Sequence, residues 1–302
     1  MKVSNHEWRP EVCLLALVVL CLPAGAAAQA WLPHAGEGTV SVTYQGLYSR
    51  DHLDLNGAPF DKGRVTSHLL LVGIEYGLTD RLTIDARVGA VSRKHAGVDA
   101  FHGPLDNGRY HGAIQDVRVG LAWQMTDARA VAIAPFVAVI LPTHEYETRG
   151  HSAPGRRLRT LQVGAWVGRS FGRGYLQAQG AYALVERVVG MSTNRTLLDA
   201  EVGYPLWRPV TARMTTTLHR THGGVTWPLS PHLDDHVRHD HDRVSRDNFA
   251  VMSGGVSVAV SRGTSIYGTV IRTLSGQNTH KVLGGTVGVA WSFGRIVSFG
   301  SD

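Results

Sequence analysis

The feature that most constrains this fold is an alternation of polar and apolar residues with period two, sustained over segments of about ten to thirteen residues. In Asp116–Met125, one face collects Asp, Arg, Gly, Ala and Gln, whereas the other collects Val, Val, Leu, Trp and Met. Such alternation is typical of a strand with water on one side and an apolar phase on the other. Twelve segments follow the pattern, at 38–50, 64–76, 82–92, 113–125, 130–141, 158–170, 174–186, 194–206, 210–220, 247–260, 264–274 and 280–294.

The connections between these segments alternate in length. Short ones at 77–81, 126–129, 171–173, 207–209 and 261–263 alternate with mostly long, polar ones at 51–63, 93–112, 142–157, 187–193, 221–246 and 275–279. An even number of strands with short turns at one end and loops at the other is typical of outer-membrane barrels, in which the turns are periplasmic. The sequence therefore predicts an all-β fold, a closed antiparallel transmembrane barrel of about twelve strands that occupies residues 31–294.

The first thirty residues read as an export signal. Lys2 and Arg9 precede an apolar run from Val12 to Leu22, and a small-residue stretch ends at Ala30. The run is shorter than the roughly twenty residues of a membrane-spanning helix, so cleavage after Ala28 or Ala30 is favoured over an uncleaved anchor. We therefore expect a signal peptide at 1–30, an outer-membrane location and a C-terminal tail at 295–302.

Composition narrows the functional classes further. Both cysteines, Cys13 and Cys21, lie in the predicted leader, so the mature chain forms no disulfide. A lipoprotein is not expected, because Leu20 precedes Cys21 where lipidation requires a small residue. The net charge is +6, but Lys and Arg are scattered singly, which disfavours a nucleic-acid partner. Outer-membrane lipid is the expected surrounding.

The last predicted strand carries a terminal pattern of its own. Its apolar positions alternate with small ones up to two aromatic residues. The pattern resembles the C-terminal signal by which barrel-assembly machinery recognises outer-membrane proteins, although the tail 295–302 departs from it, since such proteins usually end at the aromatic residue. The residues that would carry this signal are Thr286, Gly288, Trp291 and Phe293.

Several segments together resemble a known family. They are Ala30–Pro33 with Gly36 and Gly38, Glu75–Leu82, Tyr110–Gly112 with Gln115–Leu121, and Pro135–Ala138. They look like the outer-membrane transporters grouped as the MetA-pathway-of-phenol-degradation family. The resemblance implies a barrel that helps small, often apolar or aromatic, compounds across the outer membrane, similar in outline to long-chain fatty-acid transporters. No counterpart of the N-terminal hatch of those transporters is expected, since the first strand begins soon after Trp31.

Alternation assigns a set of charged and amide side chains to the barrel interior. Charges of both signs on neighbouring strands fit two readings, a pore lining that selects solutes by charge or a structural plug of ion pairs. The predicted lumen residues are Glu75, Asp85, Arg87, Asp116, Arg118, Gln177, Gln179, Asp199, Glu201 and Arg213.

Histidine gathers in the long loops. Twelve histidines fall in or beside them: His52, His95, His102, His111, His144, His151, His222, His232, His236, His239, His241 and His280. In the densest run, His232, His236, His239 and His241 alternate with carboxylates, which indicates a candidate site for Zn, Cu or Ni. A solvated loop that gains charge as pH falls explains the same composition.

Enzymatic readings are weaker. Gly168–Gly172 fits the hydrolase pattern G-x-S-x-G, but it lies on a strand that enters a short turn, where no helix follows. His219, His222 and Asp247 could belong to a rim-located catalytic group, although their spacing does not favour one. We therefore expect no enzyme and no cofactor. The leading hypothesis is a channel or transporter for a small solute, and the alternative is a non-transporting surface barrel whose His-rich loops bind metal or a partner.

Overall fold

The computed structural model describes residues 30–97, 104–126, 131–226, 229, 232 and 234–294. The predicted leader, except Ala30, and the tail 295–302 lie outside these residues, as do His102 and part of the 126–129 turn. The elements are β1 (Gly38–Leu53), β2 (Pro59–Gly77), β3 (Leu82–Ala96), β4 (His111–Ile114), β5 (Val117–Trp123), β6 (Ala132–Leu141), β7 (Thr160–Phe171), β8 (Gly174–Val185), β9 (Asn194–Trp207), β10 (Val210–His222), α1 (Asp235–His239), β11 (Asn248–Ala259), β12 (Thr264–Gln277) and β13 (Thr279–Phe293).

The strands form one closed antiparallel barrel. Apart from β4 and β5, strands that follow one another in the sequence pair with each other, and β1 pairs with β13 to complete the ring. Since β4 and β5 both pair with β3, they share one place in the wall, and the thirteen strands occupy twelve positions. The predicted twelve-stranded barrel is confirmed.

Several predicted boundaries differ from the structure: β2 begins at Pro59 rather than at 64, and β3 ends at Ala96 rather than at 92. The segment 113–125 is one strand in the prediction, but it is interrupted at Gln115 and Asp116, whose side chains bind a loop inside the barrel. The predicted loop at 275–279 shrinks to Asn278, which has a φ of 55°. Asparagine tolerates this left-handed conformation better than most residues, which lets β12 and β13 meet in a tight link.

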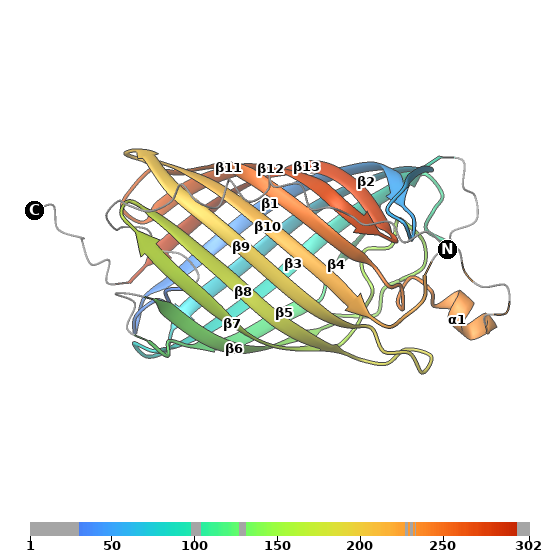
Figure 1. The fold of residues 1–302 in the computed structure, drawn as a ribbon, viewed down its shortest axis with the longest axis horizontal. Helices are drawn as coiled ribbons and strands as arrows, with labels where there is room; N and C mark the ends of the chain where they lie inside the picture. Colours follow the sequence, from blue (N-terminus) through green and yellow to red (C-terminus); the bar gives the residue numbers. More distant parts are fainter. Residues whose placement is uncertain are drawn as a thin grey trace, which may run out of the picture.

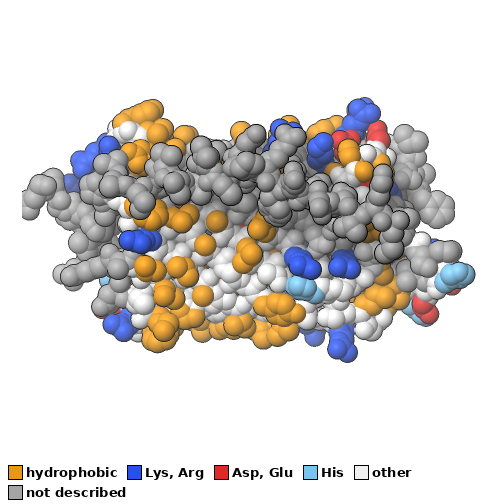
Figure 2. Space-filling view, in the orientation of Figure 1, with side chains coloured by type: hydrophobic (Ala, Val, Ile, Leu, Met, Phe, Trp, Pro, Cys, Tyr) orange, Lys and Arg blue, Asp and Glu red, His pale blue; other side chains and the backbone are white. Residues whose placement is uncertain are grey.

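The outer face of the wall is apolar. Val42, Leu70, Val137 and Val163 belong to a long series of large hydrophobic side chains that are 36 to 64% exposed on the strands. In Figure 2 hydrophobic side chains are spread along the uncovered part of the wall, and Lys and Arg stand mostly at its left end and in its right half. A water-soluble monomer rarely exposes so continuous an apolar surface, whereas hydrocarbon would cover it.

The two ends of the barrel differ, and we call them the turn end and the loop end. The turn end holds the short connections and the aromatic residues that finish several strands, including Tyr76, Trp123, Trp291 and Phe293. The loop end holds the long connections, and α1 lies there beyond the wall (Figure 1). No helix in the described ranges is long and apolar enough to cross a membrane.

Candidate functional site: the barrel lumen

The lumen is lined by the strand faces opposite the apolar band. Nine of the ten predicted lumen residues lie within strands on this inner face, and Asp116 lies at the break between β4 and β5. Arg87 and Arg213 remain partly solvated, since their side chains are 42% and 34% exposed. The interior is therefore not a dry core at the height of Arg87.

One ionic cluster joins β3 and β5. Arg118 is hydrogen-bonded to Asp85, and Nε of Arg87 lies 3.9 Å from the same carboxylate. The Arg118 guanidinium also lies 5.8 Å from the centre of the Phe136 ring, within cation–π range. Glu75 is a neighbour of the cluster on β2 and pairs in register with Asp85. Two cations thus share a site with two carboxylates.

A second cluster surrounds Glu201 on β9. Its carboxylate accepts hydrogen bonds from Tyr175 Oη at 2.6 Å, Gln177 Nε2 at 3.2 Å, Thr215 Oγ1 at 3.2 Å and Arg213 Nη2 at 2.7 Å. The Glu201 side chain is only 12% exposed. A buried carboxylate requires this number of donors, so the cluster ties β8, β9 and β10 together. Elsewhere on this wall, Thr217 binds Asp199.

The chain before β1 enters the turn end of the lumen. The Ala30 amide donates to Gln177 Oε1 at 3.1 Å, and the Leu32 amide donates to Gln124 Oε1 at 2.9 Å. Trp31 packs against Gly168 and meets the Tyr175 ring edge to face. A short segment therefore narrows this end, although no N-terminal hatch is expected from the sequence.

The loop at 142–159 folds into the loop end of the lumen. Tyr146 is buried there, and its hydroxyl donates to Asp116 Oδ1 at 2.6 Å while accepting from the Arg157 amide at 3.1 Å. Gln115 Nε2 donates to the Pro154 carbonyl at 2.6 Å. These contacts explain why the wall strand breaks at Gln115 and Asp116, because both residues serve the loop.

Asp106 fixes the turn of this inserted loop. Its carboxylate accepts the amides of His151 at 2.9 Å and Ser152 at 2.8 Å. Gly150 lies between the loop and this carboxylate with a φ of 101°, where a side chain would collide with Asp106. Ser152 is fully buried, and its hydroxyl accepts the His95 amide. The loop is thus a packed part of the mouth.

The 223–247 connection covers the inserted loop. Arg156 Nη1 donates to Asp247 Oδ1 at 3.0 Å, and the Gly150 amide donates to Asp242 Oδ2 at 2.8 Å. A small apolar core that includes Leu158 and Val237 seals the contact. Burial would raise the pKa of Asp247, but cationic side chains led by Arg156 lower it to about 2. This anchor stays ionised at neutral pH.

Glu147, in the inserted loop at 142–159, has a pKa as low as that of Asp247. Hydrogen bonds from Arg149, at 2.8 Å from Nε to Oε1, lower the pKa of Glu147 from 4.5 to about 2. Because the pKa is depressed, this pair stabilises the fold above pH 4.5 and loses its contribution as the pH falls through about 2.

We expect the Glu147 carboxyl to titrate near pH 2, because Arg149 stabilises its ionised form. Side-chain ¹³C shifts of the protein in micelles measure the midpoint directly. Arg149→Ala should return the midpoint toward 4.5, whereas Arg262→Ala, at the turn end, should leave it unchanged. An unchanged midpoint in Arg149→Ala would contradict the assignment.

Two of the four predicted metal-binding histidines, His239 and His241, take partners of their own. His236 and His239 lie in α1 and His232 is exposed just before it, while His239 Nε2 lies 2.9 Å from Arg149 Nη1. His241 Nδ1 lies 2.8 Å from the Arg238 carbonyl oxygen. Among the described residues, no group of three or more His, Cys, Asp or Glu side chains is arranged to hold a metal ion. Metal binding here stays a prediction.

Four other histidines meet inside the loop end. The His280 ring centre lies 4.8 Å from that of His52 and 5.2 Å from that of His151, which lies 5.0 Å from His95. They come from β13, β1, the inserted loop and β3. Their sequence positions show only that they belong near loops, since barrel closure is what brings them together.

An apolar patch interrupts the polar lumen on one side. Phe136 is 6% exposed and packs with Ala138 and Ala181, and Trp166 and Leu197 lie against them. All five are on inner faces, opposite the exposed valines and leucines of the same strands. This patch was not predicted, because β6 alternates poorly in sequence and its two faces are both apolar.

The enzymatic readings gain no geometric support. Ser170 lies in β7 two residues before a turn, with no helix after it. His222 faces outward, where its Nε2 lies 2.8 Å from Thr196 Oγ1, whereas His219 points inward and stacks on Phe249. Asp247 binds Arg156 and accepts a hydrogen bond from Thr221 Oγ1, which lies 3.2 Å from His219 Nε2. These three predicted rim residues therefore do not form a catalytic group.

The four residues of the expected insertion pattern lie in β13, at the seam with β1. In register, Phe293 faces Gly38, Trp291 faces Val40, Gly288 faces Thr43 and Thr286 faces Gln45. Gly288 lies under the Tyr267 ring, where any side chain would collide with it. The pattern thus also serves packing at the seam, and its role in recognition stays a prediction.

Comparisons with known proteins agree on the architecture. No family model matches the sequence, and no curated protein matches it. The COG4313 outer membrane channel from Pseudomonas putida F1 has a TM-score of 0.67 at 12% identity, covering 89% of this chain and 100% of that one. The translocator domain of the autotransporter NalP from Neisseria meningitidis has a TM-score of 0.50 at 15% identity, covering 86% and 90%. The NanC porin has a TM-score of 0.50 at 9% identity, covering 83% and 98%.

Proposed function

We propose that this protein is an outer-membrane channel through which a small solute passes without energy input. The observation that carries the proposal is the partly solvated, charged lumen between two narrowed ends, which a purely structural barrel core would not need. The apolar outer wall fits a bilayer, and the fold is shared with a protein described as an outer membrane channel. The turn end would face the periplasm and the loop end the exterior.

The Asp85–Arg118 cluster would set charge selectivity. Arg118→Ala leaves Asp85 with only the more distant Arg87, so the lumen gains net negative charge. We expect the ratio of cation to anion permeability to rise about fivefold, since a unit charge at 4 Å in water acts with about 1 kcal/mol.

Reversal potentials under a KCl gradient in planar bilayers test this expectation. Arg173→Ala removes the same charge from an exposed turn and serves as the matched control. Equal selectivity in both variants would remove the cluster from the conduction path, and absence of any current from the folded protein would refute the channel itself.

The finer proposal is that the solute is small and apolar or aromatic, as the family resemblance implies. Trp166, which is partly exposed beside the buried Phe136 ring, offers an aromatic surface to such a molecule near the Arg118 guanidinium. We expect liposomes with this protein to admit an aromatic carboxylate several-fold faster than an aliphatic carboxylate of similar size. Trp166→Leu should reduce the preference, and no preference in the wild-type protein would exclude this solute class.

A further inference from the structure

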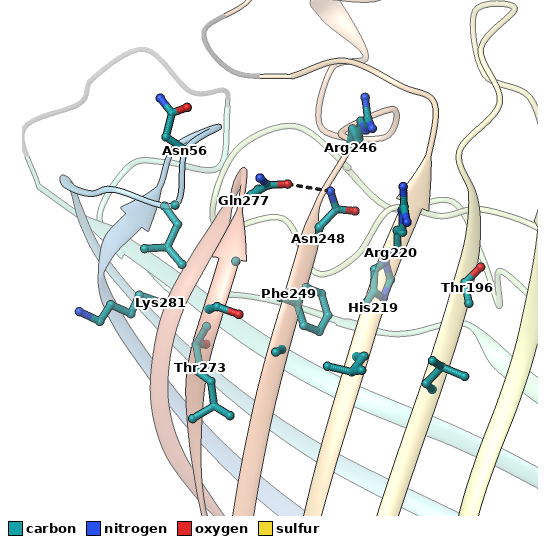
Figure 3. Close-up of a pocket in the computed structure, with 18 of the residues that line it drawn as sticks. Asn56, Thr196, His219, Arg220, Arg246, Asn248, Phe249, Thr273, Gln277 and Lys281 are labelled. Carbon is teal, nitrogen blue, oxygen red and sulfur yellow. Dashed lines mark hydrogen bonds between the residues drawn. The ribbon is translucent and has the colours of Figure 1, made fainter. Parts of the chain in front are cut away.

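A groove lies on the outer wall near the loop end, and the inward-facing residues His219 and Phe249 also contribute to its lining. Its volume is about 920 Å³, and it spans β9 to β13 beneath the tip of the β1–β2 hairpin (Figure 3). Asn56, Gly57 and Pro59 of the hairpin line one side. The hairpin leans over because Asn278 is the whole β12–β13 link and its amide donates to the Asp54 carbonyl at 3.2 Å. The groove is therefore built by the fold.

The floor of the groove is apolar and continues the lipid-facing band. Leu198 and Leu218 are register partners that are 46% and 45% exposed, and Leu218 is paired in turn with Ala250. Leu274, 53% exposed, extends the floor onto β12. These side chains offer acyl chains a surface continuous with the rest of the wall.

A polar row lies two residues nearer the loop end on the same strands. Thr196, Arg220 and Asn248 are register partners, and Asn248 Nδ2 donates to Gln277 Oε1 at 3.2 Å (Figure 3). Two residues along a strand span roughly 7 Å. Donors therefore lie one headgroup's depth above the leucines, as an amphiphile at a membrane interface would require.

The charge of this rim is entirely positive. Arg220, Arg246 and Lys281 line the groove, and none of its described lining residues is an Asp or a Glu. Within the described residues, no carboxylate is within ion-pair distance of Arg220 or Arg246, and both are exposed. Lys281 reaches Asp51 only at 4.0 Å. Guanidinium groups bind phosphate with paired hydrogen bonds, so the rim is complementary to a phosphorylated headgroup.

We propose that this groove binds a phosphorylated lipid of the outer leaflet, with its phosphate on Arg220 and Arg246 and its acyl chains on Leu198, Leu218 and Leu274. The proposal rests on the membrane location and orientation given above, but it does not depend on conduction. The occupant is a bilayer lipid rather than free phosphate, because the apolar floor would contribute nothing to a free anion.

The test is native mass spectrometry of the mature protein released from detergent with diphosphoryl lipid A. Arg220→Gln with Arg246→Gln should bind about thirtyfold more weakly, the loss expected for removing two cations from an anionic headgroup. Arg173→Gln with Arg262→Gln removes two exposed charges at the turn end and should bind as the wild type does. Heat-dependent mobility on gels checks that each variant is folded.

Binding of different lipids to the wild-type protein gives a test that does not depend on any variant. Dephosphorylated lipid A should bind weakly, and inorganic phosphate at the same concentration should not displace lipid A. Equal binding with or without phosphate on the lipid would overturn the proposal, as would equal losses in the two double variants. A protein that conducts ions but retains no lipid A refutes only the lipid site, and the converse result refutes only the channel.

Discussion

Replacing residues 145–156 by a short glycine-serine linker is expected to raise single-channel conductance several-fold. This loop lies in the mouth, where Tyr146, Ser152 and Ala153 are at most 8% exposed. Its removal leaves the wall intact, because Ile140 and Thr160 are register partners across β6 and β7 and a tight turn can join the strands there. A wider mouth lowers the resistance of the path in series with the lumen.

A single substitution in the inserted loop removes one of its hydrogen bonds to the wall but keeps its volume in the lumen. Tyr146→Phe removes the hydroxyl that joins Asp116 to the Arg157 amide, and it should increase current noise and protease access to the loop without the full gain in conductance. Tyr110→Phe is the matched control, since Tyr110 is half exposed. If the loop-deleted barrel is folded yet conducts as the wild type does, the constriction lies elsewhere.

The second large effect is on stability. Glu201→Ala should lower the free energy of unfolding by about 3 kcal/mol, because it leaves the Arg213 cation and three other hydrogen-bond donors without the carboxylate that they bind in the wild type. Unfolding by guanidinium in micelles, followed by tryptophan fluorescence, measures the difference.

A conservative variant and a control at an exposed site allow that loss of stability to be interpreted. Glu201→Gln keeps the shape and an acceptor oxygen, so its loss should be smaller than that of Glu201→Ala. Glu145→Ala changes an exposed carboxylate in the inserted loop and should stay within about 0.5 kcal/mol of the wild type. Equal stability of all three variants would show that the cluster contributes nothing net.

The wall of this barrel was predictable from sequence because its determinants are local. Most strands can be recognised by the alternation of polar and apolar residues on their two faces, and the short turns mark where they end. The twelve predicted segments therefore fall on the observed wall positions. The period-two alternation assigns Asp85 and Arg118 to the lumen face, and in the structure they form an ion pair.

The contents of the lumen could not be predicted in the same way. Tyr146 meets Asp116 across thirty positions, and the meeting depends on a loop turning inward, for which alternation gives no signal. His52 and His280 touch only because the first strand pairs with the last. The apolar patch on β6 was hidden since both faces of that strand are apolar. Long-range closure, rather than local pattern, decides these contacts.

The seam between β1 and β13 has a consequence for how the chain reaches this state. Thr39 and Ser292, which share a hydrogen bond across it, are 253 residues apart, so ring closure must wait until β13 has been synthesised. Until then the sheet has two edge strands with unpaired backbone groups, which can pair with other chains, so aggregation competes with folding. Slow pairing of β1 with β13 would then limit the yield of functional molecules, whatever the stability of the finished ring.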